Sequence, residues 1–436
     1  MAEDRTLPTL NIDDWRQLSS ADKSAAFKAL PPGEDDEFFL SLPTREQSEL
    51  LRGLPEVERR LWVRLLAPDD AADLIQATPE EDRDAFVHYL DSSTQREVSA
   101  LLAYAEDEAG GLMSTRYARL RPDMTVDEAI AYLRRQAGQV ETIYYAYVLD
   151  QQQTLLGVVS FRDLFSADRG RRVDELMRKR FISVGEGTDQ EDVARLFEEH
   201  GLLAVPVVDE QGRMKGLVTV DDIVDVVEEE ASEDIQRIGG MQALEAPYMS
   251  TKFGELVRKR AGWLAILFVG EMLTATAMAR YEEQIAKAVV LAVFIPLIIS
   301  SGGNSGSQAT TLVIRAMALG EVRLKDWWKV VRREFLTGLV LGSILALIGL
   351  SRILLWQAVA GSYGEHYMKI GLTVALSLLG VVLFGTVSGS TLPFALKRLG
   401  LDPASASAPF VATLVDVTGL VIYFSVAAAV LRGSLL

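Results

Sequence analysis

The residue with the clearest chemical potential is Asp416, which lies in the stretch APFVATLVDVTGLVIYF near the middle of the last long hydrophobic run. A carboxylate at that depth of a bilayer is costly unless it faces water, a cation or the interior of a helix bundle. The same run contains no basic residue that could pair with it. Two interpretations are open, an interhelical hydrogen bond by a protonated carboxyl group or a cation pathway, and we favour the pathway.

The stretch IPLIISSGGNSGSQATT, residues 295–311, is the second polar feature within a hydrophobic run. Proline and clustered glycines predict a break in the membrane helix, and non-helical backbone at that depth is tolerated where it lines a polar cavity. The breaks are expected at Pro296, Gly302, Gly303 and Gly306, and again at Gly385, Gly389 and Pro393. Asn304 and Gln308 add side-chain amides to the first segment. Close helix packing would explain the glycines alone, but not the amides.

The chain has no cysteine and only three histidines, which leaves oxygen atoms as the main ligands available for a metal ion. Such a ligand set is typical of the hard cations Mg²⁺ and Ca²⁺. Because Mg²⁺ gives up its water reluctantly, one or two carboxylates in a wide passage could select it through its water shell. One aspartate per chain would suit a pore on the twofold axis of a homodimer. No nucleophile–base pair is evident, so we do not expect an enzyme.

Five hydrophobic runs in the C-terminal half are long enough to cross a bilayer, which takes roughly 20 helical residues. They comprise residues 262–279, 286–320, 335–359, 368–396 and 404–431. Basic clusters at 258–260, 323–333 and 397–398 all fall on one side of a five-span arrangement, which the positive-inside rule assigns to the cytoplasm. The N-terminus lacks the apolar core of a signal peptide. We therefore expect a multi-pass protein in the lipid of the inner membrane, with the N-terminus cytoplasmic and the C-terminus outside.

Charge divides the chain into two contrasting halves. The first 250 residues carry 51 acidic and 27 basic side chains, a net charge of −24, whereas the remainder carries +7. This acidity argues against a nucleic-acid partner. It also creates repulsion within the cytosolic part, which divalent ions bound between carboxylates would relieve. Compact and expanded arrangements would then differ in their affinity for Mg²⁺, as a conformational switch requires.

The sequence predicts a multi-domain α and α/β membrane protein. The expected parts are an all-α superhelical N domain at 1–115, a duplicated α/β region at 116–230, a connecting helix at 231–260 and a five-span membrane domain at 261–436. Proline-containing dipeptides recur every 11 to 13 residues in the first part, and proline suits the start of a helix. The connecting segment is amphipathic and basic, so we expect it along the membrane surface.

The duplicated region repeats a β-α-β-β-α pattern, at about 116–172 and 173–230. It resembles a tandem pair of CBS domains, a family of adenosine-nucleotide sensors. In that family a Ser or Thr and an Asp three residues later can hold a ribose, and the matching pairs here are Ser160 with Asp163 and Thr219 with Asp222. We name Thr219 and Asp222 as candidates for a regulatory ATP. The alternative for both pairs is a helix N-cap followed by an acidic first turn.

The whole chain resembles the MgtE family of magnesium transporters and channels. The stretches that carry this resemblance include PDDAADL, AGGLMSTRY, GGNSGSQATTLVIRAMALGEV and LGLDPASASAPFVATLVDVTGLVIYF, in this order. The resemblance implies a homodimer with an Mg²⁺ site on its axis at Asp416, and with Asn304 and Gln308 nearby. It also implies cytosolic domains that bind Mg²⁺ and close the pore through the connecting helix.

Three carboxylates are our candidates for regulatory Mg²⁺ sites. They are Asp209, Asp221 and Glu245. A solvated acidic surface is the alternative for each. Gln211 and Gln242 stand where the family pattern is often acidic, so Mg²⁺-dependent closure is expected to be weaker here.

Glu271, within the first span, is unusual for the family, and it forms either an extra ion contact or a bond to a neighbouring helix. Two other functions remain open from the sequence. One is a secondary transporter coupled to H⁺ or Na⁺, which would share the acidic residue and broken helices. The other is a CBS-containing membrane receptor without transport.

Overall fold

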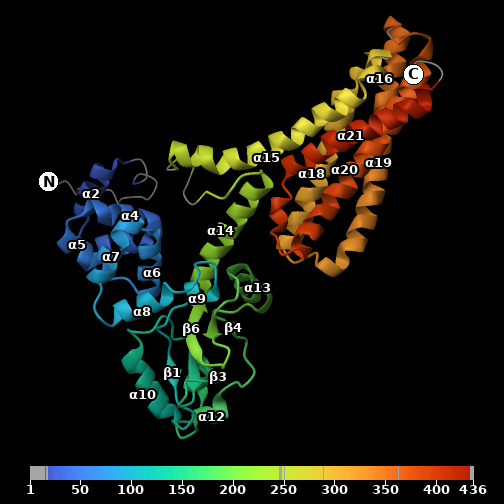
Figure 1. Ribbon diagram of the computed structural model, residues 1–436. Helices are drawn as coiled ribbons and strands as arrows, with labels where there is room; N and C mark the ends of the chain where they lie inside the picture. Colours follow the sequence, from blue (N-terminus) through green and yellow to red (C-terminus); the bar gives the residue numbers. More distant parts are fainter. Residues whose placement is uncertain are drawn as a thin grey trace, which may run out of the picture. The chain divides into compact units, whose positions relative to one another are not determined.

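The computed structural model describes residues 15, 18–244, 248–249, 251–287, 289–361 and 363–432 (Figure 1). The chain divides into two compact units, Met1–Glu228 and Glu229–Leu436. The first unit joins short helices to two small sheets, and the second consists of long helices. The architecture is therefore the multi-domain α and α/β arrangement that the sequence predicts.

Short helices form the beginning of the first unit. In the described part they are α2 (Ser20–Lys28), α3 (Glu34–Ser41), α4 (Thr44–Gly53), α5 (Glu56–Val63), α6 (Pro68–Ala77), α7 (Glu80–Tyr89) and α8 (Thr94–Leu101). Pro43, Pro55 and Pro79 occupy the N-cap positions of α4, α5 and α7, and Pro68 opens α6. Proline fits there because the first helical N–H groups have no intrahelical partner. The recurring prolines thus set where one helix ends and the next begins.

The duplicated β-α-β-β-α units follow as predicted. The first consists of β1 (Arg119–Leu120), α10 (Val126–Gln136), β2 (Tyr145–Leu149), β3 (Leu155–Ser160) and α11 (Phe161–Ser166); the second of β4 (Val184–Gly185), α13 (Gln190–His200), β5 (Ala204–Val208), β6 (Met214–Thr219) and α14 (Val220–Ile238). Short helices α9 (Ala109–Leu112) and α12 (Val173–Leu176) precede them. In each sheet the first strand is parallel and the third antiparallel to the middle strand. Equivalent buried pairs, Ala146 with Val159 and Val205 with Val218, show the same register in both copies.

The segment expected to form a connecting helix, 231–260, consists of three pieces. Helix α14 continues to Ile238, and the described residues between Gly239 and Lys252 form no helix. Helix α15 (Phe253–Arg280) then includes the basic turn and runs on through the first hydrophobic span. Gly240 follows α14 with φ of 75°, a conformation that glycine adopts without a steric penalty.

Among the described residues of the second unit, five helical segments are long and apolar enough to cross a membrane. They are α15; α17 (Val289–Ala292) with α18 (Ile295–Ala318); η1 (Leu324–Asp326) with α19 (Trp327–Ala360); η2 (Gly364–His366) with α20 (Tyr367–Arg398); and, after η3 (Pro403–Ser405), α21 (Ala408–Leu431). The short helix α16 (Glu282–Lys287) lies between the first two segments. Helices α18, α20 and α21 pack against one another, α19 packs on α20, and α15 packs on α21 (Figure 1).

The break predicted at Pro296 is confirmed, because α17 ends at Ala292 and α18 begins at Ile295 with Pro296 in its first turn. The breaks predicted at the glycines and at Pro393 are wrong, because α18 and α20 run unbroken through these residues. The glycines are points of close approach between the two helices instead. A Cβ on Gly306 would lie 3.0 Å from the carbonyl oxygen of Gly385. Nearby, Thr310 Oγ1 donates to the carbonyl of Gly389 at 2.9 Å. Small residues allow this contact without opening either helix, as the packing alternative anticipated.

Candidate functional site

Asp416 lies well inside α21, on a helix whose start is firmly capped. The hydroxyl of Ser407 accepts a hydrogen bond from the amide of Phe410 at 3.4 Å, and Pro409 occupies the first turn. The Asp416 side chain is half-buried in the single chain. Among the described residues it has no hydrogen-bond donor and no basic partner, and Glu271 is the charged group that acts on it. The carboxylate is therefore available to a cation.

Helix α18 lies antiparallel to α21 and in close contact with it. Ser307 Oγ donates to the carbonyl of Ala408 at 3.1 Å, near the start of α21. Further along, a Cβ on Gly302 would lie 2.9 Å from Val415 Cγ1. The glycine-rich sequence of α18 thus brings its polar segment directly beside the helix that carries Asp416.

Asn304 and Gln308 are one turn apart on α18, and both side chains are exposed in the single chain. At 1.5 Å per residue, Asn304 lies about one turn and Gln308 about two turns from Asp416, towards the start of α21. Asn304 Nδ2 donates to Ser300 Oγ at 3.5 Å. The structure thus spaces the three predicted pore residues at successive turns of one helix pair.

An acidic cluster in the first unit is formed by carboxylates of α6 and of the start of α14: Asp69, Asp70, Asp73, Asp221 and Asp222. Burial raises the pKa of Asp73 to about 7, and the charges of Asp69, Asp70 and Asp222 raise it further. Burial also raises the pKa of Asp222 to about 7, with Asp221 and Asp69 contributing. The pKa of Asp70 rises to about 6, through burial and then the charge of Asp69. These carboxylates repel one another, so a cation between them would stabilise this arrangement.

In the part of the chain that the structure describes, no three acidic or histidine side chains converge as direct metal ligands. Because Mg²⁺ usually keeps several waters, carboxylates can hold it through those waters. Asp69, Asp70 and Asp73 were not among the candidate residues predicted from the sequence. Their spacing in PDDAADL places all three within one helix, which was the available signal.

The three predicted regulatory residues have different surroundings. Asp221 belongs to the acidic cluster, since its charge acts on Asp70. Asp209 accepts from Arg213 Nε at 2.8 Å and lies 3.5 Å from Lys215 Nζ. Burial acts to raise the pKa of Asp209, but hydrogen bonds from Arg213 outweigh it and lower that pKa to about 2. An ion at Asp209 would therefore have to displace Arg213. Glu245 lies outside the described residues.

In both candidate ribose pairs the two residues bond to each other at the start of a helix, and Ser160 is the N-cap of α11. Ser160 Oγ accepts from the amide of Asp163 at 3.0 Å, and Asp163 pairs with Arg178 at 3.2 Å. Thr219 Oγ1 donates to Asp222 Oδ2 at 2.7 Å. The capping interpretation accounts for these contacts without a ligand, so nucleotide binding stays a prediction.

Within the second unit, the end of α14 and the first half of α15 each contact the segment that leads into α21. Arg237, near the end of α14, pairs with Asp402 and with Glu233. Trp263 Nε1 of α15 donates to Ser407 Oγ, the N-cap of α21, at 3.1 Å. Neither Arg237 nor Asp402 was a candidate from the sequence, because the two residues are 165 positions apart. Both contacts end on the segment that introduces the Asp416 helix.

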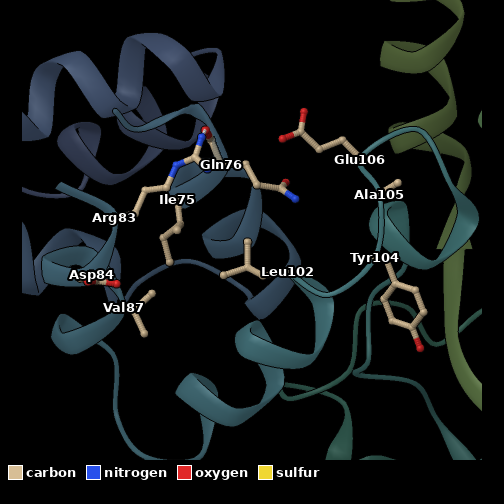
Figure 2. A pocket seen from close by; sticks show the side chains of 9 residues that line it. All are labelled: Ile75, Gln76, Arg83, Asp84, Val87, Leu102, Tyr104, Ala105 and Glu106. Atoms are coloured by element: carbon tan, nitrogen blue, oxygen red, sulfur yellow. Dashed lines mark hydrogen bonds between the residues drawn. The ribbon is translucent and has the colours of Figure 1, made fainter. Parts of the chain in front are cut away.

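A hollow of about 510 Å³ lies elsewhere in the first unit, between α6, α7, α8 and residues 104–106 (Figure 2). Its one arginine, Arg83, donates to the backbone carbonyls of Thr78 and Gln76 at 2.9 and 2.6 Å. That side chain therefore stabilises the turn between α6 and α7, and we assign no ligand to the hollow.

Comparison with known proteins identifies the family. Residues 295–426 match the MgtE family, described as a divalent cation transporter; residues 12–107 match the MgtE intracellular N domain, and residues 109–170 and 173–229 match the CBS domain. Magnesium transporter MgtE of Thermus thermophilus is 40% identical over 421 residues, which cover 96% of this chain and 92% of that protein. The chain belongs to the MgtE family.

Two further MgtE proteins are similar to this chain. Magnesium transporter MgtE of Bacillus subtilis is 34% identical over 361 residues, which cover 83% of this chain and 78% of that protein. One solved structure is the cytosolic domain of an Mg²⁺ channel MgtE in complex with ATP. It is 43% identical in sequence to this chain, and the match covers 49% of this chain and 87% of the solved chain, with a TM-score of 0.46. The family resemblance drawn from the sequence is confirmed. With five apolar helices in the part that the structure describes, the chain is a multi-pass membrane protein.

Proposed function

We propose that this chain transports Mg²⁺ across the inner membrane, through a pore on the twofold axis of a homodimer. The observation that carries the proposal is Asp416, a carboxylate inside a membrane helix with no donor or basic partner among the described residues. The magnesium-transporter names of full-length relatives support the choice of ion. The basic clusters support a cytoplasmic N-terminus and an external C-terminus.

The pore residues would act on a hydrated ion. Two copies of Asp416 across the axis would attract a divalent cation through its water shell, because Mg²⁺ dehydrates reluctantly. Asn304 and Gln308, one and two turns away, would offer amide oxygens to the same waters. Ca²⁺ sheds its water more readily and accepts longer, more flexible ligand distances, so a wide passage with few direct ligands favours Mg²⁺.

Mg²⁺ flux into proteoliposomes tests the pore. We expect Asp416→Ala and Asp416→Asn to abolish uptake, while Glu365→Gln, a matched loss of charge in η2, leaves it unchanged. Unchanged uptake in both Asp416 variants would remove the proposed ion site. Uptake that persists without an H⁺ or Na⁺ gradient would favour a channel over the alternative of an ion-coupled secondary transporter.

The acidic cytosolic unit would be the Mg²⁺ sensor. Mutual repulsion in the cluster around Asp70, Asp73, Asp221 and Asp222 gives Mg²⁺ a higher affinity for the compact arrangement than for an expanded one. Asp209 and Glu245 are further candidate ligands.

Helix α14 links the sensor to the pore domain. It carries Asp221 at its start and Arg237 at its end, and Arg237 pairs with Asp402 before the pore helix. Deletion of residues 1–250 should retain conduction and abolish inhibition by Mg²⁺. Retained inhibition would contradict the sensor.

ATP would be a regulatory ligand at Thr219 and Asp222. The supporting feature is the Ser/Thr–Asp pair after the last strand of the second CBS unit. Since Asp222 lies among other carboxylates, the nucleotide is expected as its Mg²⁺ complex rather than free. Calorimetric titration of the full chain with ATP, with and without Mg²⁺, tests this. Binding of free ATP that equals binding of the Mg²⁺ complex would contradict the expectation.

A further inference from the structure

Helices α15 and α21 lie side by side and run in the same direction. Near the start of the pair, Trp263 Nε1 donates to Ser407 Oγ at 3.1 Å. Near its end, the rings of Tyr281 and Phe424 stack with centroids 4.7 Å apart. These contacts fix the vertical register of the two helices, because each helix rises about 1.5 Å per residue.

That register places Glu271 and Asp416 at nearly the same depth. Interpolation between the two contacts places Glu271 at the level of the α21 residues one to two positions before Asp416. The axial distance between Glu271 and Asp416 is therefore roughly 2 Å. Between them, a Cβ on Gly270 would lie 3.0 Å from Thr413 Cγ2, so the helices approach closely at this level. The negative charge of Glu271 also acts on the Asp416 carboxylate.

Asp416 points between the two neighbours of α21. At 100° per residue, Ala412 and Val415 mark the side that faces α18, whereas Thr413 and Phe424 mark the side that faces α15. Asp416 falls between these two sides. Its carboxylate is therefore accessible from α15 as well as from the polar segment of α18.

Glu271 itself has no partner among the residues that the structure describes that would explain its position. In the described part of the chain it forms no ion pair or hydrogen bond, and its side chain is exposed. It lies about as far from the basic turn at 258–260 as from Arg280, so it sits near the middle of the span. An exposed carboxylate at that depth is too costly to face lipid and requires water, a cation or a second chain. Water and a cation are what the passage beside Asp416 would supply.

We infer that Glu271 supplies a second carboxylate to the ion passage at Asp416 and sets its preference for divalent over monovalent cations. The inference rests on the proposed function, and a homodimer would then present four carboxylates at one level. A doubly charged ion gains twice the attraction of a singly charged one from each carboxylate, so the second pair sharpens the discrimination. Glu271 would not need to displace water from Mg²⁺, because the attraction acts through the water shell.

The test compares Glu271→Gln with Glu271→Asp and with Glu283→Gln, a matched loss of charge just after the span. Uptake of Mg²⁺ and Na⁺ is measured in proteoliposomes that contain the full chain. We expect Glu271→Gln to raise the half-saturating Mg²⁺ concentration about tenfold and to increase Na⁺ uptake relative to Mg²⁺. Glu271→Asp keeps the charge and should stay near the parent protein, as should Glu283→Gln.

Two results would overturn the inference. One is a Glu271→Gln variant with the half-saturation and Na⁺ to Mg²⁺ ratio of the parent. The other is equal impairment of Glu271→Gln and Glu271→Asp, which would show that the shape of the side chain matters and its charge does not. Asp416→Asn in the same assay separates the two proposals. If Asp416→Asn abolishes uptake while Glu271→Gln changes nothing, only the role of Glu271 fails; if Asp416→Asn is silent, the pore site itself fails.

Discussion

Raising the pH should lower the free energy of unfolding of the first unit when Mg²⁺ is absent, and added Mg²⁺ should restore it. The relevant groups are Asp70, with a pKa raised to about 6, and Asp73 and Asp222, each with a pKa raised to about 7. Between about pH 4 and about pH 7 the folded unit binds more protons than the unfolded chain does. The stabilisation from these protons is therefore complete below about pH 4 and is lost as the pH rises through 7.

The size of the effect follows from Asp222, the least exposed of the three. Its pKa rises from 3.8 to about 7, and a tenfold change in proton affinity corresponds to about 1.4 kcal/mol. Deprotonation of Asp222 therefore destabilises the folded unit by at most about 4 kcal/mol. Asp70 and Asp73 are more exposed, so solvent screening reduces their contributions. The three carboxyl groups also titrate together, so their contributions to the free energy of unfolding are not additive.

Urea unfolding of residues 1–228, the compact first unit, measures this free energy. The free energy of unfolding should fall by a few kcal/mol from about pH 5 to about pH 8 without Mg²⁺, and it should change little in millimolar Mg²⁺. Asp73→Asn should flatten the pH dependence, whereas Asp84→Asn, the same change at an exposed residue of α7, should preserve it. A pH-independent free energy, or equal slopes with and without Mg²⁺, would refute the idea that the cluster holds a cation.

Three further changes probe the second unit. Arg237→Ala removes the ion pair with Asp402, which contributes about 1 kcal/mol. This variant should weaken the inhibition of flux by Mg²⁺ severalfold, while uptake at low Mg²⁺ persists. Unaltered inhibition would count against a role of this ion pair in coupling. Trp263→Phe deletes the bond to Ser407, worth about 1 kcal/mol, and should lower the midpoint of thermal unfolding by a few degrees in calorimetry. Gly385→Val would drive a side chain into the backbone of Gly302. It should abolish the monodisperse peak in size-exclusion chromatography, and a normal peak would refute the close packing of α18 on α20.

The membrane spans, the duplicated domains and Asp416 could be predicted from the sequence because the signals for them are local. The length of an apolar run determines whether a helix can cross a bilayer, so the five spans needed no tertiary information. The period of the strands and helices revealed the duplicated CBS units. Asp416 stood out because a charge inside a membrane helix is costly wherever the helix is placed.

Tertiary structure decided how these parts meet. The glycines of α18 could have broken the helix or allowed close packing, and only the presence of α20 against them selected an unbroken helix. The approach of Asp70 and Asp73 to α14, the pairing of Arg237 with Asp402, and the shared depth of Glu271 and Asp416 all join distant segments. Such contacts depend on the packing of whole helices, which spacing along a single chain does not encode.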